Sequence, residues 1–216
     1  MTTKQRFGLP RLQLERMKRF STETDRVEAF SDGVFAVIIT IMVLELRPPH
    51  GGDLRDFLPS LPTILIYALS FVFVGIYWNN HHHMLRASKG VDGRAMWANL
   101  HLLFWISLVP FSTAWLGQDP TAAGPTVFYG IILLLDAVAY TILQRSLRTV
   151  NGHESPFARA VAVDVKGMAS IVLYLLAIGT AFFLPVAADA IFVVIAAMWL
   201  VPDRRFEPLI DRGEQS

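Results

Sequence analysis

The chain contains no cysteine, which excludes disulfide bonds and thiolate metal sites. Charge is also scarce, since 17% of the 216 residues are charged while 53% are hydrophobic. Soluble domains carry less apolar and more charged sequence than this. Residues 1–25 are polar and basic without a short apolar core, so we expect no cleavable signal peptide. These features predict an integral membrane protein with one membrane domain.

Catalytic and nucleotide-binding signatures are missing as well. The sequence contains no GxSxG or Ser/Lys pattern, no GxGxxG and no P-loop. We therefore expect no enzymatic activity and no cofactor. The basic residues of positions 1–21 suit an anionic membrane surface better than nucleic acid, because basic residues beside a first membrane helix usually set topology.

Six apolar stretches predict membrane helices, and none alternates with the period of a barrel strand. Proline, glycine and short polar runs separate these stretches. The expected helices cover residues 26–46, 58–80, 95–116, 125–147, 165–184 and 187–201. The second should stop in the polar run 79–83, the third should kink at Pro110, and residues 148–159 should form a polar loop. The expected division is a basic cytoplasmic segment (1–23), a six-helix transmembrane domain (24–201) and a cytoplasmic tail (202–216).

Basic residues fall mainly on one side of this six-helix arrangement. Of the 19 Lys and Arg residues, only Arg47 and Arg55 lie in a segment opposite the N-terminus, which leaves 17 on the other side. Cytoplasmic loops carry the excess of Lys and Arg, so both termini are expected in the cytoplasm. The expected location is the cell membrane, with membrane lipid as a partner and without nucleic acid.

The first expected helix carries charge within an apolar stretch, which usually marks function. On a wheel of 3.6 residues per turn, one stripe contains Arg26, Phe30, Val37, Ile41 and Leu44, flanked by Thr40. Asp32 points nearly the opposite way. We infer that the stripe faces a pore while neighbouring helices hold Asp32. Ordinary helix packing is the alternative interpretation of such a stripe.

A buried Asp32 requires hydrogen-bond donors. The expected donors are Asn80, His81 or His82, and Asn99. These bonds would attach the first helix to the next two without contacting ions. Two placements of Arg26 stay open, one at the cytoplasmic mouth of the pore and one beside an acidic neighbour.

The run His81-His82-His83 suggests a metal site, but consecutive residues on a helix point about 100° apart. Since no HExxH pattern supports convergence on one ion, we expect no metal. Asp136 and Asp189 each lie in an apolar helix and are more simply explained as polar anchors than as proton relays.

The start of the first helix resembles a known family signature. Arg26-x-x-x-Phe30-Ser31-Asp32 is similar to the signature of the transmembrane protein 175 family, which comprises the lysosomal potassium channel of animals and shorter prokaryotic relatives. The similarity extends to Gly33–Ala36, Thr40, Leu44–Leu46, Trp78, Asn80–His82, Asn99–Leu100 and Ser107–Thr113. The chain departs from the family at His83, where Arg or Lys is usual, and at Val37, where a larger side chain is common.

This resemblance implies a homotetramer of six-helix protomers, with the first helix lining the pore and no carbonyl-lined filter loop. It implies a pore constriction and gate at Val37, Ile41 and Leu44, and ion selectivity at Thr40 and Ile41. The implied structural network contains Arg26, Phe30, Ser31, Asp32, Trp78, Asn80, His81, His82 and Asn99. The expected function is a potassium-permeable cation channel with a hydrophobic gate.

Two other functions stay open from the residues alone. One is a proton-coupled or cation secondary transporter that uses Asp32, Asp136 and the histidines at 81–83. Such carriers usually contain internal repeats, and no convincing repeat relates residues 24–117 to 123–201. The other is a non-conducting membrane protein that uses the histidines with a metal.

Overall fold

The chain folds into a single bundle of helices in the computed structural model, which describes residues 11–162 and 164–201. The elements are α1 (Arg11–Leu44), the 3-10 helix η1 (Leu54–Ser60), α2 (Leu61–Ala87), α3 (Gly93–Ile106), α4 (Val109–Gln118), α5 (Ala123–Asn151), α6 (Pro156–Ala162), α7 (Val165–Ala181) and α8 (Pro185–Leu200). These ranges contain no strand, in agreement with the hydropathy pattern. An all-helical fold is thus confirmed.

Five helical stretches are long and apolar enough to cross a membrane. They are Thr22–Leu44, Leu54–Ala87, Gly93–Gln118, Ala123–Asn151 and Pro156–Ala181, while Pro185–Leu200 is a shorter apolar helix. The expected six crossings therefore correspond to five full-length spans and α8, which has 16 residues. This composition is that of a multi-pass membrane protein.

Two helices extend beyond their expected ends. α1 begins at Arg11, inside the segment 1–23 that we expected to precede the membrane domain. α2 continues through the polar run 79–83 to Ala87, so the expected end of the second helix was wrong. The reason is packing, since His81, Met84 and Leu85 are fully buried and hold this last part of α2 against the bundle. Tertiary contacts thus override the helix-ending signal of the polar residues.

The expected kink at Pro110 is a break between two helices. α3 ends at Ile106, four residues before the proline, and α4 begins at Val109. A proline ring clashes with the carbonyl four residues earlier and supplies no amide proton, which accounts for this position of the break. The expected loop 148–159 is also partly helical, because α5 reaches Asn151 and α6 begins at Pro156.

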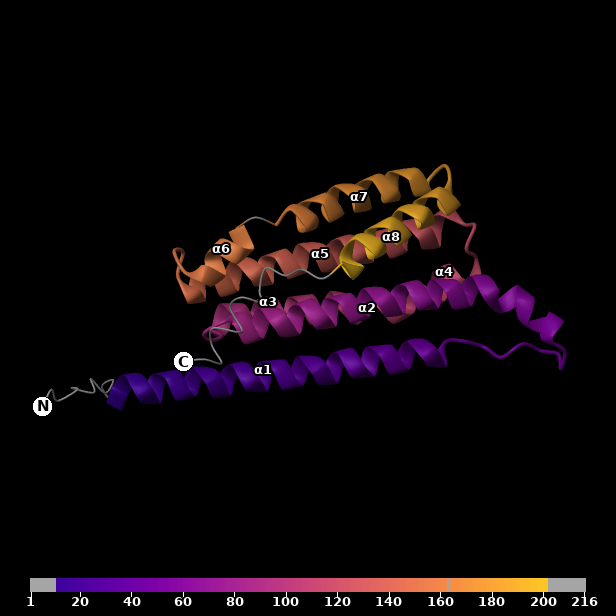
Figure 1. Ribbon diagram of the computed structural model, residues 1–216. Helices are drawn as coiled ribbons and strands as arrows, with labels where there is room; N and C mark the ends of the chain where they lie inside the picture. Colours follow the sequence, from indigo (N-terminus) through magenta and orange to yellow (C-terminus); the bar gives the residue numbers. More distant parts are fainter. Residues whose placement is uncertain (1–10, 163, 202–216) are drawn as a thin grey trace, which may run out of the picture.

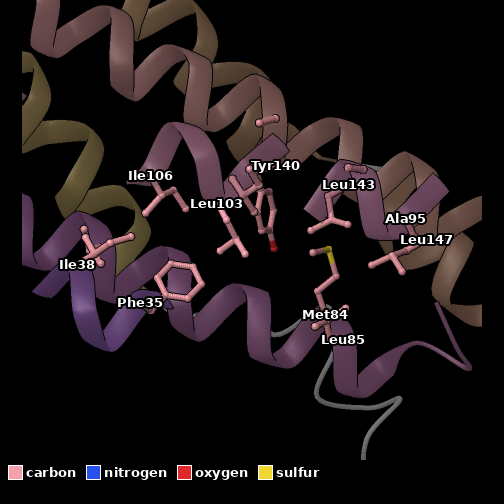
Figure 2. Close-up of a cluster of buried hydrophobic side chains, with 14 of the residues drawn as sticks. Phe35, Ile38, Met84, Leu85, Ala95, Leu103, Ile106, Tyr140, Leu143 and Leu147 are labelled. Atoms are coloured by element: carbon pink, nitrogen blue, oxygen red, sulfur yellow. The ribbon is translucent and has the colours of Figure 1, made fainter. Parts of the chain in front are cut away.

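α1 lies along one edge of the bundle beside α2, whereas α7 lies along the opposite edge (Figure 1). The inner face of α1 packs against α2, α3 and α4. Phe35 and Ile38 of α1 join a buried cluster with side chains of α2, α3 and α5 (Figure 2). A second cluster joins α2, α4, α5, α7 and α8 around Tyr129, Tyr174 and Phe192. The core therefore fixes one face of α1 and leaves the other uncovered.

Candidate functional site

The uncovered face of α1 carries the apolar stripe that the helical wheel predicted. Exposed fractions are 57% for Phe30, 55% for Val37, 43% for Ile41 and 79% for Leu44. By contrast, the inward-facing Phe35, Ile38 and Met42 are between 1% and 3% exposed. The stripe is thus no part of the protomer core, which excludes packing within one chain as its role.

Thr40 is exposed on the same side of α1 as this stripe. Its hydroxyl donates to the backbone carbonyl of Val37 at 2.8 Å, the back-bonding expected of a helical threonine. Because that bond uses the hydroxyl proton, the lone pairs of the oxygen stay available to accept a bond or coordinate a cation.

A groove of about 710 Å³ runs beside the stripe, between α1 and the region where α3 meets α4. Its α1 wall includes Phe30, Val37 and Ile41, and its other wall includes Pro110 and Phe111. The outer surface of α3 and α4 is also apolar, with exposed side chains at Trp97, Phe104, Phe111 and Trp115. Exposed apolar side chains are therefore present on α1, α3 and α4.

Ser31, His81 and Asn99 form a buried polar chain across three helices, with exposed fractions of 2% or less. The Asn99 amide donates to Ser31 Oγ at 3.0 Å, and Asn99 Oδ1 lies 2.7 Å from His81 Nε2. Ser31 Oγ in turn donates to the carbonyl of Val27 at 2.7 Å. The chain links α1 to α2 and α3, and a buried polar group left without its partner is costly.

Asp32 faces α2 and takes a different partner from those expected. The indole Nε1 of Trp78 donates to Asp32 Oδ1 at 2.9 Å. His81 and Asn99, two of the expected donors, instead bond each other beside Ser31, and Asn80 donates to the carbonyl of Ile76 in its own helix. The expected attachment of the first helix through Asp32 exists, but the tryptophan makes it.

Glu28 is a residue of this region that sequence reasoning missed. The Oε1 atom of Glu28 lies 2.7 Å from Nδ1 of His82 on α2. On α1, Glu28 precedes Asp32 by one helical turn. The signal that identifies it is the spacing of four residues between two acidic side chains, which places both on one side of a helix. Arg26, for which two placements were open, is exposed and lines a small groove with Glu23, Phe30 and Met96.

The residues of the transporter alternative are not gathered in one place. Asp136 is fully buried in α5, and neither of its carboxylate oxygens has a hydrogen-bond partner within the described part of the chain. Asp32 bonds Trp78, and His82 contacts Glu28. Asp136 on α5 is therefore not gathered with Asp32 and His82, which lie close together between α1 and α2.

Comparisons with known proteins agree with the geometry. Residues 26–110 match the family described as endosomal/lysosomal potassium channel TMEM175. A protein of Chryseobacterium sp. (strain P1-3) named as a potassium channel is 48% identical over 182 residues, which is 84% of this chain and 95% of that protein. One of Streptomyces collinus, also named as a potassium channel, is 34% identical over 155 residues, which is 65% of this chain and 75% of that protein.

The fold resembles that of a solved structure. A crystal structure of a lysosomal potassium-selective channel TMEM175 homolog from Chamaesiphon minutus superimposes with a TM-score of 0.74. The two chains are 28% identical, and the superposition covers 84% of this chain and 98% of the other. The similarity therefore extends well beyond the signature, through most of the helical bundle.

Proposed function

Because the chain belongs to the TMEM175 family of potassium channels, we propose that it conducts potassium through a central pore formed by the α1 helices of four copies. Membership confirms the resemblance of the Arg26–Asp32 signature. It also places the chain among ion channels rather than enzymes, as the missing catalytic signatures predicted. We further propose that α1 forms the constriction of the pore.

The exposed stripe of α1 is the observation that carries the proposal. Val37, Ile41 and Leu44 follow one another along one face of a helix at the edge of the bundle. The cavity lined by α2, α5, α7 and α8 measures only about 30 Å³. That volume accommodates about one or two water molecules and no ion path. We therefore place the proposed ion path at the outer surface of α1, between copies of the chain.

The apolar stripe would act as a gate by excluding water. Four copies of Val37, Ile41 and Leu44 around an axis form rings that offer a dehydrated cation no replacement for its water shell. Widening of these rings admits water and ions. Thr40 supplies the polar layer, since its oxygen lone pairs remain available after the bond to Val37. Potassium is the proposed ion, with other monovalent cations as candidates for weaker permeation.

The buried network would hold the pore helix in place without contacting the ion. Ser31 and Asp32 lie on the inner side of α1, bonded to Asn99 and Trp78. The proposed orientation has both termini in the cytoplasm of a cell-membrane protein. The start of α1, the end of α2 and the start of α3 share one end of the bundle (Figure 1), and Arg86 and Arg94 lie at that end.

Cysteine crosslinking tests the assembly, and the cysteine-free chain needs no background substitution. Cysteines placed singly at Ile41 or Leu44 should form disulfides between subunits under oxidation. Val193 is a matched control, because it is 53% exposed but lies on α8, away from α1. A variant with cysteine at Val193 should remain uncrosslinked in mild detergent. Crosslinking at Val193 but not at the α1 positions would contradict the proposed pore.

Reconstitution in liposomes tests conduction itself. A potassium gradient should drive flux that appears as unitary current steps in single-channel recordings. Saturating flux coupled to protons, without unitary steps, would show a carrier and contradict the channel proposal.

A further inference from the structure

A cluster of ligand-type side chains joins α1 to α2, away from the proposed pore stripe. Glu28, Asp32 and His82 each provide one potential ligand atom, and these atoms all lie within 4.8 Å of one another. Glu28 and Asp32 are one turn apart on α1, while His82 comes from α2. We propose that this cluster binds a divalent transition-metal cation, for which zinc is the reference ion, and that the bound cation ties the two helices together.

The distances suit coordination after small side-chain rotations. Zinc lies about 2.0–2.2 Å from oxygen and nitrogen ligands, so two ligand atoms on the same ion are separated by about 3–4 Å. His82 Nδ1 and Glu28 Oε1 are already in contact at 2.7 Å. The third atom, within 4.8 Å, must move by about 1 Å to share the ion.

The ligand types set the class of metal. Two carboxylates and one imidazole suit zinc and other first-row transition cations, whereas magnesium and calcium prefer sites made of oxygen ligands alone. Joint coordination of one ion by His81, His82 and His83 is not proposed, because neighbouring helical side chains diverge, as expected from the sequence. His82 takes part with the carboxylates of another helix, and His81 bonds Asn99 instead.

Trp78 contacts two of the three proposed ligands, Asp32 and His82, and can hold them in orientation. Its indole donates to Asp32 Oδ1 at 2.9 Å and leaves the other carboxylate oxygen for a cation. The same indole stacks on the His82 ring, with centroids 6.2 Å apart and an interplanar angle of 28°. Groups that orient ligands in this way typically change metal affinity about 10–100-fold when they are removed.

The cluster is open to water on the protomer. The side chain of His82 is 29% exposed and that of Glu28 is 19% exposed, so a hydrated cation can reach both. A cation held there would tie the pore helix α1 to α2 and oppose widening of the gate. Metal binding stands on the cluster alone, whereas this effect on conduction rests on the proposed channel function.

Titration calorimetry tests the binding. The full-length protein, purified in detergent without a histidine tag, should bind one zinc ion per chain, and magnesium chloride should give no comparable heat. Glu28→Gln and His82→Asn should each weaken zinc affinity at least about tenfold, and Trp78→Phe about 10–100-fold. Because Gln keeps the shape of Glu, the Glu28 variant decides the question even where the histidine variant fails to fold.

Two matched controls lie on α2 and in the segment after α1. His83→Asn removes the neighbouring histidine, and Glu45→Gln removes an exposed acid outside the cluster. Both variants should bind zinc with the affinity of the unmodified protein. The proposal is overturned if the unmodified protein shows no saturable binding, or if Glu28→Gln and His82→Asn bind as tightly as the controls.

Potassium flux in liposomes tests the consequence for the channel. Micromolar zinc should lower flux several-fold in the unmodified protein and leave the Glu28→Gln variant unaffected. Equal inhibition of both proteins would refute the claim that zinc bound between α1 and α2 lowers conduction. Absence of potassium flux under every condition would refute the proposed function, while calorimetry would still decide the metal site.

Discussion

Replacing Ile41 with Asn should convert the proposed gate from a dry ring into a hydrated one. Ile41 is 43% exposed on the protomer, so the change alters the proposed pore surface and leaves the core intact. An apolar wall offers a cation nothing in place of water, whereas a carboxamide oxygen can replace part of the hydration shell. In a tetramer, four carboxamides would act at one level of the pore.

The expected size follows from the energetics of polar groups in apolar surroundings. Removing a polar group from water without a partner costs about 1–3 kcal/mol in proteins, which sets the scale of the gain from one carboxamide. A combined gain of only about 1.4 kcal/mol raises the rate of crossing about tenfold. We therefore expect potassium flux to rise at least about tenfold and discrimination against sodium to fall.

Liposome flux and reversal potentials with potassium and sodium on opposite sides measure both quantities. Val43→Asn is the matched control, because Val43 is 46% exposed but points about 200° away around the helix. It lines a different groove, with Leu46 and Tyr67, and its substitution should leave conduction unchanged. An equal rise for Ile41 and Val43, or an unchanged flux for Ile41→Asn, would refute the gate assignment.

Three further predictions follow from named contacts. Thr40→Ala should lower potassium selectivity in reversal-potential measurements without raising closed-state leak, whereas Thr141→Ala, which loses a similar back-bond in α5, should leave selectivity unchanged. Ser31→Ala removes the acceptor of the Asn99 amide and should cost about 1–3 kcal/mol, seen as a lower melting temperature with unaltered selectivity. Gly130→Ala should destabilise the fold by about 1–3 kcal/mol, because an added Cβ would lie 2.9–3.0 Å from side chains of α7 and α8, while Gly179→Ala meets nothing within 4 Å and should not destabilise. A melting temperature for Gly130→Ala equal to that of Gly179→Ala would contradict this packing.

The amino-acid sequence determined the fold class and which face of α1 is uncovered. Long apolar runs predict membrane helices because a helix satisfies its own backbone polar groups in lipid. The 3.6-residue period then places Val37, Ile41 and Leu44 on one face of the helix. It places Phe35 and Ile38 on another face, and the exposed fractions of the two groups agree with this division. Both inferences depend on local geometry, which the order of residues along one helix contains.

Only the tertiary structure decided where helices end and which polar groups meet. α2 continues to Ala87 because His81 and Leu85 are buried by neighbouring helices, a fact that the polar run itself does not reveal. The choice of Trp78 rather than Asn80 as the donor to Asp32 depends on the relative rotation and depth of α1 and α2. Such pairings arise between helices distant in sequence, so residue spacing within one helix cannot select among donors of similar chemistry.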